Sequence, residues 1–387
     1  MKAIIAGGGT GGHFFPAIAL AEELESRHPE LSLLFVGVEG GVEASLLAAK
    51  CWDFEKIKAS GLQGKRLSQR LRGLAQIPSA LNRSRSIIRR FCPDIVVGFG
   101  GYASASIVLA GVLARVPTVI HEQNVFPGLA NRWLGRVVDL VAVAFEGASG
   151  FFPKGKVRVT GNPVRRELFG PNRAEAMARF RLDPHRLTVL VFGGSQGAHR
   201  LNHALLEALP LLEPEREQIQ FIHATGPGDL AAVRRGYIAG GHRAVVEPFF
   251  GEMAVAYAAA DLCLCRAGAG TVAEVCALGK PSILVPFPFA TNDHQRRNAE
   301  ALVTCGGARM VEDSKLNGAA VAEIVRAFLR DREGLRAMAN RAKALAKPDA
   351  AARLADLVER SVHLHRSLAR SNSGQQFTVN SSRCGHV

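Results

Sequence analysis

The feature that most constrains the fold of this chain is a local order of apolar strand, glycine-rich turn and helix, which occurs in both halves. Three such turns, GGGTGGH, GFGGYAS and GGSQGA, follow short apolar runs and span residues 7–13, 98–104 and 193–198. Glycine permits a sharp turn and lets a ligand approach the backbone closely. Strands that alternate with helices in this way predict an α/β fold, with parallel sheets covered by helices on both faces.

The alternation ends near the middle of the chain and then starts again, which predicts two doubly wound, Rossmann-like domains. A chain of 387 residues also exceeds what one hydrophobic core usually serves. We place the first domain at residues 1–163 and the second at 164–349. A helical pattern at about 350–370 is expected to pack back on the first domain, and residues 371–387 are expected to form a disordered tail.

A basic amphipathic stretch in the first half indicates an anionic partner. The chain has a formal net charge of +14, and no Asp or Glu occurs from Lys56 to Pro93. Apolar residues alternate with the basic ones, which suits an anionic membrane surface, although a solvated helix face is an equally open interpretation. Aromatic residues for base stacking are almost absent, so we expect no nucleic-acid partner. The residues expected to contact the membrane are Lys65, Arg66, Arg70, Arg72, Leu74, Ile77, Leu81 and Arg83.

The first glycine turn alone is compatible with a different chemistry. Gly7, Gly9 and Gly12 satisfy the G-x-G-x-x-G fingerprint of dinucleotide-binding proteins, and Glu39 could bind a ribose hydroxyl. An NAD(P)-dependent oxidoreductase is therefore an open alternative. The chain has no G-x-x-x-x-G-K-[ST] motif, which excludes a P-loop. The third turn, in the second half, favours an anionic ligand that is held from both halves.

The segment CRAGAGTVAE, at residues 265–274, is a further candidate site in the second half. Its small residues allow close approach of a ligand, and Thr271 could be the N-cap of the following helix, with Glu274 completing a T-x-x-E capping box. The functional alternative is that the Glu274 carboxylate accepts hydrogen bonds from two ribose hydroxyls. Downstream, Asp293, Gln295 and Asn298 could bind sugar hydroxyls or cap a helix.

Seven motifs occur in the order and spacing of the bacterial MurG-type N-acetylglucosaminyltransferases, and the chain resembles that family over about residues 1–369. The motifs are GGGTGGH, GGYAS, HEQN, GNPVR, GGSQGA with Asn202, CRAGAGTVAE and DHQRRNA. The resemblance implies a GT-B glycosyltransferase, with two Rossmann-like domains and an active site in the interdomain cleft.

The reaction that this resemblance implies is the inverting transfer of GlcNAc from UDP-GlcNAc to the C4 hydroxyl of MurNAc in undecaprenyl-pyrophosphoryl-MurNAc-pentapeptide (lipid I). The product would be lipid II, for peptidoglycan synthesis. The enzyme would lie peripherally on the cytoplasmic face of the membrane, against anionic lipids of the inner leaflet. A related GT-B transferase with another nucleotide sugar or acceptor is the alternative. We expect no cofactor, and no metal because the chain has no D-x-D motif.

The resemblance also assigns residues to roles, position by position. The donor, UDP-GlcNAc, would contact Thr10, Gly11, Gly12, Asn124, Arg165, Ser195, Phe250, Ala269, Gly270, Thr271, Val272, Ala273, Glu274 and Gln295. The acceptor pyrophosphate would lie against Gly9, Gly100, Gly101, Tyr102 and Ser104. The catalytic residues would be His13 and Glu274.

His13 has the chemistry that an inverting transfer needs. The acceptor hydroxyl must lose its proton to a base, and a histidine titrates near neutral pH. A core histidine or a simple phosphate ligand is the alternative for His13. Cleavage of the donor places negative charge on the UDP phosphates, which Arg165 and the helix N-termini would stabilise. We therefore expect turnover to survive EDTA.

Overall fold

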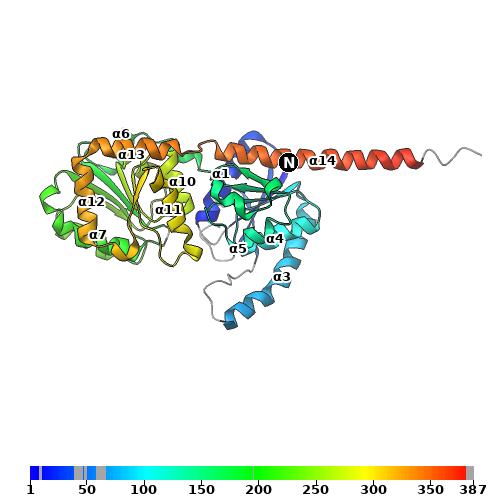
Figure 1. The fold of residues 1–387 in the computed structure, drawn as a ribbon, viewed down its shortest axis with the longest axis horizontal. Coiled ribbons are helices and arrows are strands. Elements are labelled where there is room, and N and C mark those ends of the chain that lie inside the picture. The colour runs from blue at the N-terminus through cyan, green and yellow to red at the C-terminus, as the bar shows by residue number, and fades with distance from the viewer. Residues whose placement is uncertain (8–10, 39–46, 48–49, 58–66, 195, 381–387) are drawn as a thin grey trace, which may run out of the picture. The chain divides into compact units, whose positions relative to one another are not determined.

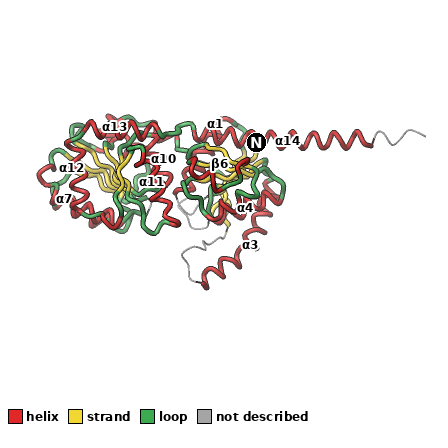
Figure 2. Tube along the Cα trace, in the orientation of Figure 1, coloured by secondary structure: helices red, strands yellow, loops and turns green. Residues whose placement is uncertain are grey.

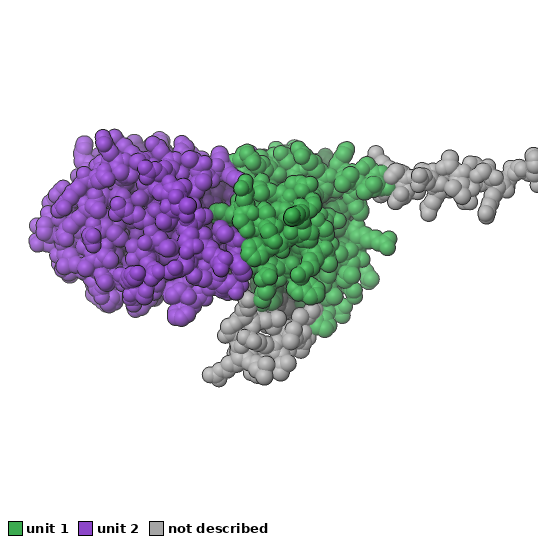
Figure 3. Space-filling view, viewed as in Figure 1, with its two compact units in different colours: residues 1–122, 127–160, 349–387 green, residues 123–126, 161–348 purple. Residues whose placement is uncertain are grey.

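The computed structural model describes residues 1–7, 11–38, 47, 50–57, 67–194 and 196–380, with the backbone alone over 67–77 and 369–380. The chain divides into two compact units, coloured in Figure 3. Unit 1 comprises residues 1–122, 127–160 and 349 onward, and unit 2 comprises residues 123–126 and 161–348. Glu39, Lys65, Arg66, Gly9, Thr10 and Ser195 lie outside the described residues.

Unit 1 is built on a seven-stranded parallel sheet in the order β3-β2-β1-β4-β5-β6-β7. The strands are β1 (Lys2–Ala6), β2 (Ser32–Val38), β3 (Asp53–Ile57), β4 (Ile95–Gly98), β5 (Thr118–Glu122), β6 (Leu140–Val143) and β7 (Val157–Val159). The inner strand β1 pairs Ile4 with Leu34 of β2 on one side and with Val96 of β4 on the other. Because helices cover both faces, the central strands are continuous apolar runs rather than alternating ones.

Helices lie on both faces of this sheet, as Figures 1 and 2 show. They are α1 (Gly11–Arg27), α3 (Leu67–Phe91), α4 (Tyr102–Leu113), α5 (Leu129–Leu134) and α14 (Ala350–Asn380), with short 3-10 helices at Glu146–Phe151 and Lys154–Lys156. Apolar side chains of α1 and α14 share one core with β1 and β4, whereas those of α3 and α4 belong to a second core. The sheet of unit 1 is therefore buried on both sides.

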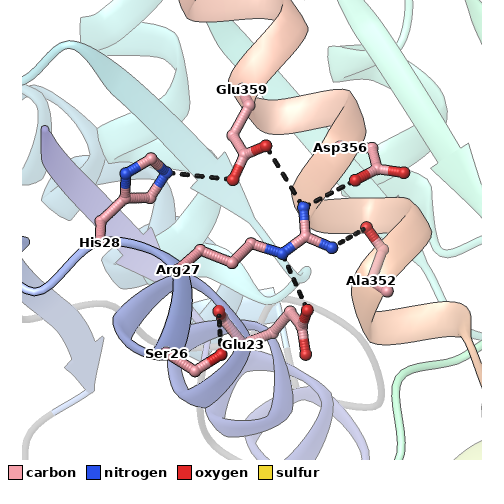
Figure 4. A network of polar contacts seen from close by, with 7 residues as sticks. All are labelled: Glu23, Ser26, Arg27, His28, Ala352, Asp356 and Glu359. Carbon is pink, nitrogen blue, oxygen red and sulfur yellow. Dashed lines mark hydrogen bonds and ion pairs between the residues drawn. The ribbon is translucent and has the colours of Figure 1, made fainter.

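The last helix, α14, is joined to α1 by a cluster of ion pairs (Figure 4). The Arg27 guanidinium donates to Asp356 Oδ1 at 2.6 Å, to Glu359 Oε2 at 3.2 Å and, from Nε, to Glu23 Oε1 at 2.8 Å. His28 Nε2 lies 3.0 Å from Glu359 Oε1. Both ends of the chain thus contribute to unit 1. The helix continues to Asn380, whereas the sequence predicts a disordered tail from residue 371, so the two differ over ten residues of backbone.

Unit 2 repeats the plan with a six-stranded parallel sheet in the order β10-β9-β8-β11-β12-β13. The strands are β8 (Leu187–Phe192), β9 (Ile219–Ala224), β10 (Ala244–Glu247), β11 (Leu262–Cys265), β12 (Ser282–Leu284) and β13 (Ala308–Met310). The helices are α6 (Arg173–Phe180), α7 (His199–Leu211), α8 (Leu230–Ala239), α9 (Met253–Ala259), α10 (Ala269–Ala277), α11 (His294–Thr304), α12 (Gly318–Arg330) and α13 (Arg332–Ala344). Short 3-10 helices span Arg166–Phe169, Glu213–Glu215, Thr291–Asp293 and Asp313–Lys315.

Both sheets have the doubly wound order, since the first strand of each unit lies inside the sheet and later strands extend it on both sides. The predicted α/β fold with two parallel sheets is confirmed. In such sheets ligands bind beyond the carboxyl ends of the strands, at the point where the strand order reverses. That point lies between β1 and β4 in unit 1 and between β8 and β11 in unit 2. Of the helices in the described part of the chain, none has the length and apolarity that a membrane span requires.

Candidate active site

The helix α10 of unit 2 begins earlier than the sequence predicts. Its N-cap is Gly268, with an extended backbone at φ −62° and ψ 148°, and Val272 N–H donates to Gly268 O at 2.9 Å. Thr271 therefore lies within the first turn, and the predicted Thr271 cap and its capping box with Glu274 are wrong. A glycine can cap a helix without a side-chain hydrogen bond, so the T-x-x-E pattern of side chains indicated the wrong N-cap.

Glu274 instead lies in the second turn of α10, where two side chains hold its carboxylate. The Tyr257 hydroxyl donates to Glu274 Oε2 at 2.9 Å, and Arg165 Nη2 lies 3.6 Å from Glu274 Oε1. The Glu274 side chain is 14% exposed. Burial raises the pKa of Glu274, and the charge of Arg165 and the hydrogen bond from Tyr257 oppose that rise. The result is an oriented acceptor for hydroxyl groups at the carboxyl end of the sheet.

Backbone near Glu274 is open on one side. A Cβ built on Gly270, in the first turn of α10, would meet no atom within 4 Å. The N–H groups of this turn lack intrahelical partners, and the helix dipole makes the region favourable for a phosphate. Close approach at Gly270 is therefore sterically free in the part of the chain that the structure describes.

The turn after β8 needs glycine for a different reason. A Cβ on Gly193 would lie 2.3 Å from Ala198 Cβ, and Gly197 has φ +76° with a Cβ position 2.1 Å from Thr225 O. Gly194, at φ +95°, faces open space instead. The described residues of the turn are thus packed tightly against their neighbours at Gly193 and Gly197 and are open at Gly194.

A buried polar network supports this turn from below. Asn202 donates to Thr225 O and to Asp229 Oδ2, both at 2.8 Å, and its Oδ1 lies 3.0 Å from His223 Nε2. His223 Nδ1 lies 3.2 Å from the Tyr237 hydroxyl. Burial lowers the pKa of His223 to about 3, against the opposing charge of Asp229, so the ring is neutral at physiological pH. Asn202 belongs to the motif that begins with GGSQGA, but its hydrogen-bond partners lie more than 20 residues further along the chain, so the sequence did not predict this network.

The predicted sugar-binding residue Gln295 lies in the first turn of α11. Its Oε1 accepts from Phe287 N–H at 2.9 Å. Asn298 is fully buried and has another task, since its Nδ2 donates to Asn124 Oδ1 and its Oδ1 accepts from Val125 N–H, both at 3.1 Å. Asn298 therefore fixes the predicted donor ligand Asn124 within unit 2. It neither caps a helix nor has its amide oxygen open to a sugar.

Four other predicted donor residues lie in unit 2. Phe250, in the turn between β10 and α9, is 6% exposed, and its ring packs edge-on against Phe180 at 5.6 Å. Such burial leaves the backbone of residue 250, rather than its ring, as the contact for a base. Val272 is buried on α10, and Ala273 is partly exposed beside it. Arg165 donates from Nη1 to Glu167 Oε1 at 2.6 Å.

In unit 1, the predicted base and the predicted acceptor turn are neighbours. Gly100 has φ +97°, and a Cβ built on it would lie 3.2 Å from both Cδ2 and Nε2 of His13. Gly101, at φ +85°, is the N-cap of α4, so Tyr102 begins that helix. Ser104 is buried in the first turn of α4, next to Gly98. The His13 ring therefore packs on the backbone of the acceptor turn.

A buried carboxylate also lies near this turn. Glu122, at the carboxyl end of β5, is 1% exposed and accepts from Asn131 Nδ2 at 2.9 Å and from Gly128 N–H at 3.2 Å. Asn131 Nδ2 is 3.6 Å from the Cβ position of Gly100. Neither Glu122 nor Asn131 is a sequence-predicted site residue. The strand-end position of the HEQN motif was the signal that could have found Glu122.

Comparison with known proteins identifies the family. Models of the glycosyltransferase family 28 N-terminal and C-terminal domains match residues 3–143 and 188–354. The UDP-N-acetylglucosamine--N-acetylmuramyl-(pentapeptide) pyrophosphoryl-undecaprenol N-acetylglucosamine transferase of Myxococcus xanthus is 46% identical over 357 residues, covering 92% of each chain. The enzyme of the same name from Geobacter sp. (strain M21) is 46% identical over 351 residues, 91% of this chain and 94% of its own. Acinetobacter baumannii MurG, a crystal structure, is similar with a TM-score of 0.71 and 30% identity, over 93% of this chain and 99% of that one. The chain belongs to the MurG family.

This MurG-family chain is accordingly a glycosyltransferase, and the predicted enzyme class is confirmed. The alternative of an NAD(P)-dependent oxidoreductase is not favoured, because the first glycine turn, which alone suggested a dinucleotide, lies within the matched glycosyltransferase N-terminal domain. Among the described residues of this MurG-family enzyme, no group of three or more His, Cys, Asp or Glu side chains is arranged to hold a metal ion.

Proposed function

We propose that this MurG-family enzyme transfers GlcNAc from UDP-GlcNAc to the C4 hydroxyl of MurNAc in lipid I, which yields lipid II. The observation that carries the proposal is the Glu274 carboxylate, oriented by Tyr257 and Arg165 beside the open backbone of Gly270. A carboxylate in that position suits the two hydroxyls of a ribose, and the first turn of α10 suits the adjoining diphosphate. The names of the Myxococcus and Geobacter relatives describe the same transfer.

In the proposed reaction, the acceptor C4 oxygen forms a bond to C1 of GlcNAc while the bond from C1 to the UDP phosphate oxygen breaks. The C4 proton passes to His13, and UDP leaves as the anion. Arg165 and the N-terminal turn of α10 stabilise the charge that develops on the diphosphate. His13 is suited to the base role because its ring contacts Gly100, in the turn proposed to hold the acceptor pyrophosphate.

A transfer assay tests the proposal. We expect radiolabel from UDP-GlcNAc to appear in a lipid I analogue with the wild-type chain, with EDTA present, and to be lost in His13→Ala. We also expect UDP-GlcNAc to raise the melting temperature more than other UDP-sugars do. Stabilisation by NADH alone, or transfer that requires an added metal, would contradict the proposal.

We further propose that the enzyme acts at the anionic cytoplasmic face of the membrane, through the basic helix α3. Arg83 already pairs with Glu55 at 2.7 Å, so it contributes less to this surface than the sequence predicts. Charge reversal of Arg66, Arg70 and Arg72 should abolish co-sedimentation with phosphatidylglycerol vesicles, and Arg83→Glu alone should have little effect. Undiminished sedimentation of the triple variant would refute this contact.

A further inference from the structure

Two exposed phenylalanines follow β12 and have no role in the function proposed so far. Phe289 is 83% exposed and Phe287 is 41% exposed. Their rings pack edge to face, with centroids 5.6 Å apart and planes at 72°. Single exposed apolar side chains are common, but a packed aromatic pair that faces water is less so, and it often marks a binding surface.

The side chain of Arg266 supports the Phe287 ring of this pair. The Arg266 guanidinium lies 5.5 Å from the centre of the Phe287 ring. Arg266 itself is only 9% exposed. Arg266 Nη1 donates to Asp313 Oδ1 at 2.6 Å, and both side chains of that ion pair are largely buried. A buried, paired arginine that stacks on an aromatic ring restricts the ring's movement. Phe287 is therefore a fixed support for the more exposed Phe289.

The backbone of this segment is also constrained. Pro286 and Pro288 flank Phe287, and Ala290 N–H donates to Phe287 O at 3.1 Å. Asn292 and Asp293, which follow, both have left-handed backbones with φ near +53° and +54°. Neither is glycine, and such conformations cost free energy and persist where the surroundings impose them. The prolines, this hydrogen bond and the two left-handed residues thus restrict the backbone of the segment.

The position of the pair relates it to the proposed donor site. Phe287 N–H donates to Oε1 of Gln295, the residue proposed to bind sugar hydroxyls. The segment begins two residues after β12, whose neighbour β11 leads into Gly270 and α10. All of these groups lie at the carboxyl end of the same sheet, where a doubly wound domain binds its ligand.

The chemistry of the pair suits one part of the donor. A GlcNAc ring in the chair form has its hydroxyls at the rim and axial C–H groups on its faces, so each face is apolar. An aromatic face attracts such C–H groups, because the ring face carries partial negative charge. Resting on the proposed function, we propose that Phe289, supported by Phe287 and Arg266, is a stacking platform for the GlcNAc ring of UDP-GlcNAc, while Gln295 binds hydroxyls at the rim.

Calorimetric binding of UDP and of UDP-GlcNAc to the full chain tests the platform. Phe289→Ala should weaken UDP-GlcNAc binding about 3- to 10-fold and leave UDP binding unchanged, because UDP has no sugar ring to stack. Phe289→Tyr, which keeps the aromatic face, should bind both as the wild type does. The matched control is Ile238→Ala on α8, which removes another exposed apolar side chain, 80% exposed, from unit 2 and should change neither affinity.

The outcomes separate the platform from the function on which it rests. Equal affinities of wild type and Phe289→Ala for UDP-GlcNAc, or an equal loss for UDP and UDP-GlcNAc, would overturn the platform. A rise in KM for the lipid acceptor alone would also overturn it, in favour of stacking on the acceptor. If the wild type binds UDP but gains nothing from the sugar and transfers none, the proposed function fails instead.

Discussion

Both units are expected to bind a ligand at the carboxyl end of a parallel sheet, but the groups that would bind it differ: side chains in unit 2 and mainly backbone in unit 1. In unit 2 the described candidate side chains are held by neighbouring groups, since the Tyr257 hydroxyl donates to Glu274 and the Phe287 backbone N–H donates to Gln295. In unit 1 the described candidates are mostly backbone, with His13 packed on Gly100. Oriented side chains suit a ligand that is selected by its hydroxyls, whereas an open glycine turn suits a phosphate. Substitutions in unit 2 should therefore reduce ligand binding more than stability, whereas substitutions in the glycine turn of unit 1 should reduce stability.

Among the substitutions that compare the two units, the largest expected effect is from Glu274→Gln, which should separate binding from stability in unit 2. Gln has the same size and still accepts from Tyr257, but it lacks the charge that strengthens hydrogen bonds from hydroxyls. The loss of such charge-assisted bonds should lower kcat/KM for GlcNAc transfer by roughly 10²-fold. Steady-state assays over a range of UDP-GlcNAc concentrations would measure this.

Stability should change in the opposite direction. Burial raises the Glu274 pKa above 4.5, its value in the unfolded chain, so the folded unit keeps this proton to a higher pH than the unfolded chain does. The free energy of unfolding of unit 2 therefore falls as pH rises from 4.5 to the folded-state pKa and is constant above it. At pH 7 the Gln variant should therefore resist unfolding at least as well as the wild type. Tyr257→Phe, which keeps the ring and removes only the hydrogen bond, should lose less activity than Glu274→Gln. Full activity of Glu274→Gln would show that this carboxylate does not bind the donor.

The next effect compares the same substitution, Gly→Ala, in each unit. Gly100→Ala places a Cβ at φ +97° and against the His13 ring, which should destabilise unit 1 by about 1–3 kcal/mol. Trp52 and Trp133, the two tryptophans of the chain, both belong to unit 1, so denaturation followed by tryptophan fluorescence would measure this.

Gly270→Ala should leave the stability of unit 2 intact and instead weaken UDP binding. Its Cβ meets nothing within 4 Å, and alanine is the better helix former by up to ~1 kcal/mol, so the free protein should be no less stable. The methyl group would instead occupy space proposed for the donor, and UDP affinity should fall. A stable Gly100→Ala, or a Gly270→Ala that binds UDP normally, would remove the proposed difference between the units.

The fold was predictable from sequence because parallel strands must be apolar throughout, and runs such as LTVLVF, which forms β8, have that character. The ends of the strands were equally clear, so Glu274 and Gln295 could be predicted as site residues. The residues that contact them could not be predicted. Tyr257 reaches Glu274 from another helix, 17 residues away, and Gly268 caps α10 without a side-chain signal. Phe289 was missed because exposure is a property of the folded unit and leaves no pattern in sequence.

The smallest expected effect concerns the support beneath the glycine turn of unit 2. Burial lowers the pKa of His223 to about 3, while an unfolded histidine titrates near 6.5. Between these values the unfolded chain binds a proton that the folded unit does not. The neutral ring thus contributes its full stability above about pH 6.5, and unit 2 should lose about 1.4 kcal/mol per pH unit below that value.

Hydrogen exchange in peptides that cover β9, compared between pH 7 and pH 5.5, would measure this loss in unit 2 alone, because exchange reports local as well as global opening. His223→Gln keeps a donor and an acceptor for Asn202 and Tyr237, so it should remove the dependence on pH while weakening the unit at pH 7. His185→Gln, at an exposed histidine of the same unit, is the control and should retain the wild-type slope. An unchanged slope in His223→Gln would mean that another group senses the acid, and that the network under Asn202 supports the turn without making unit 2 acid-sensitive.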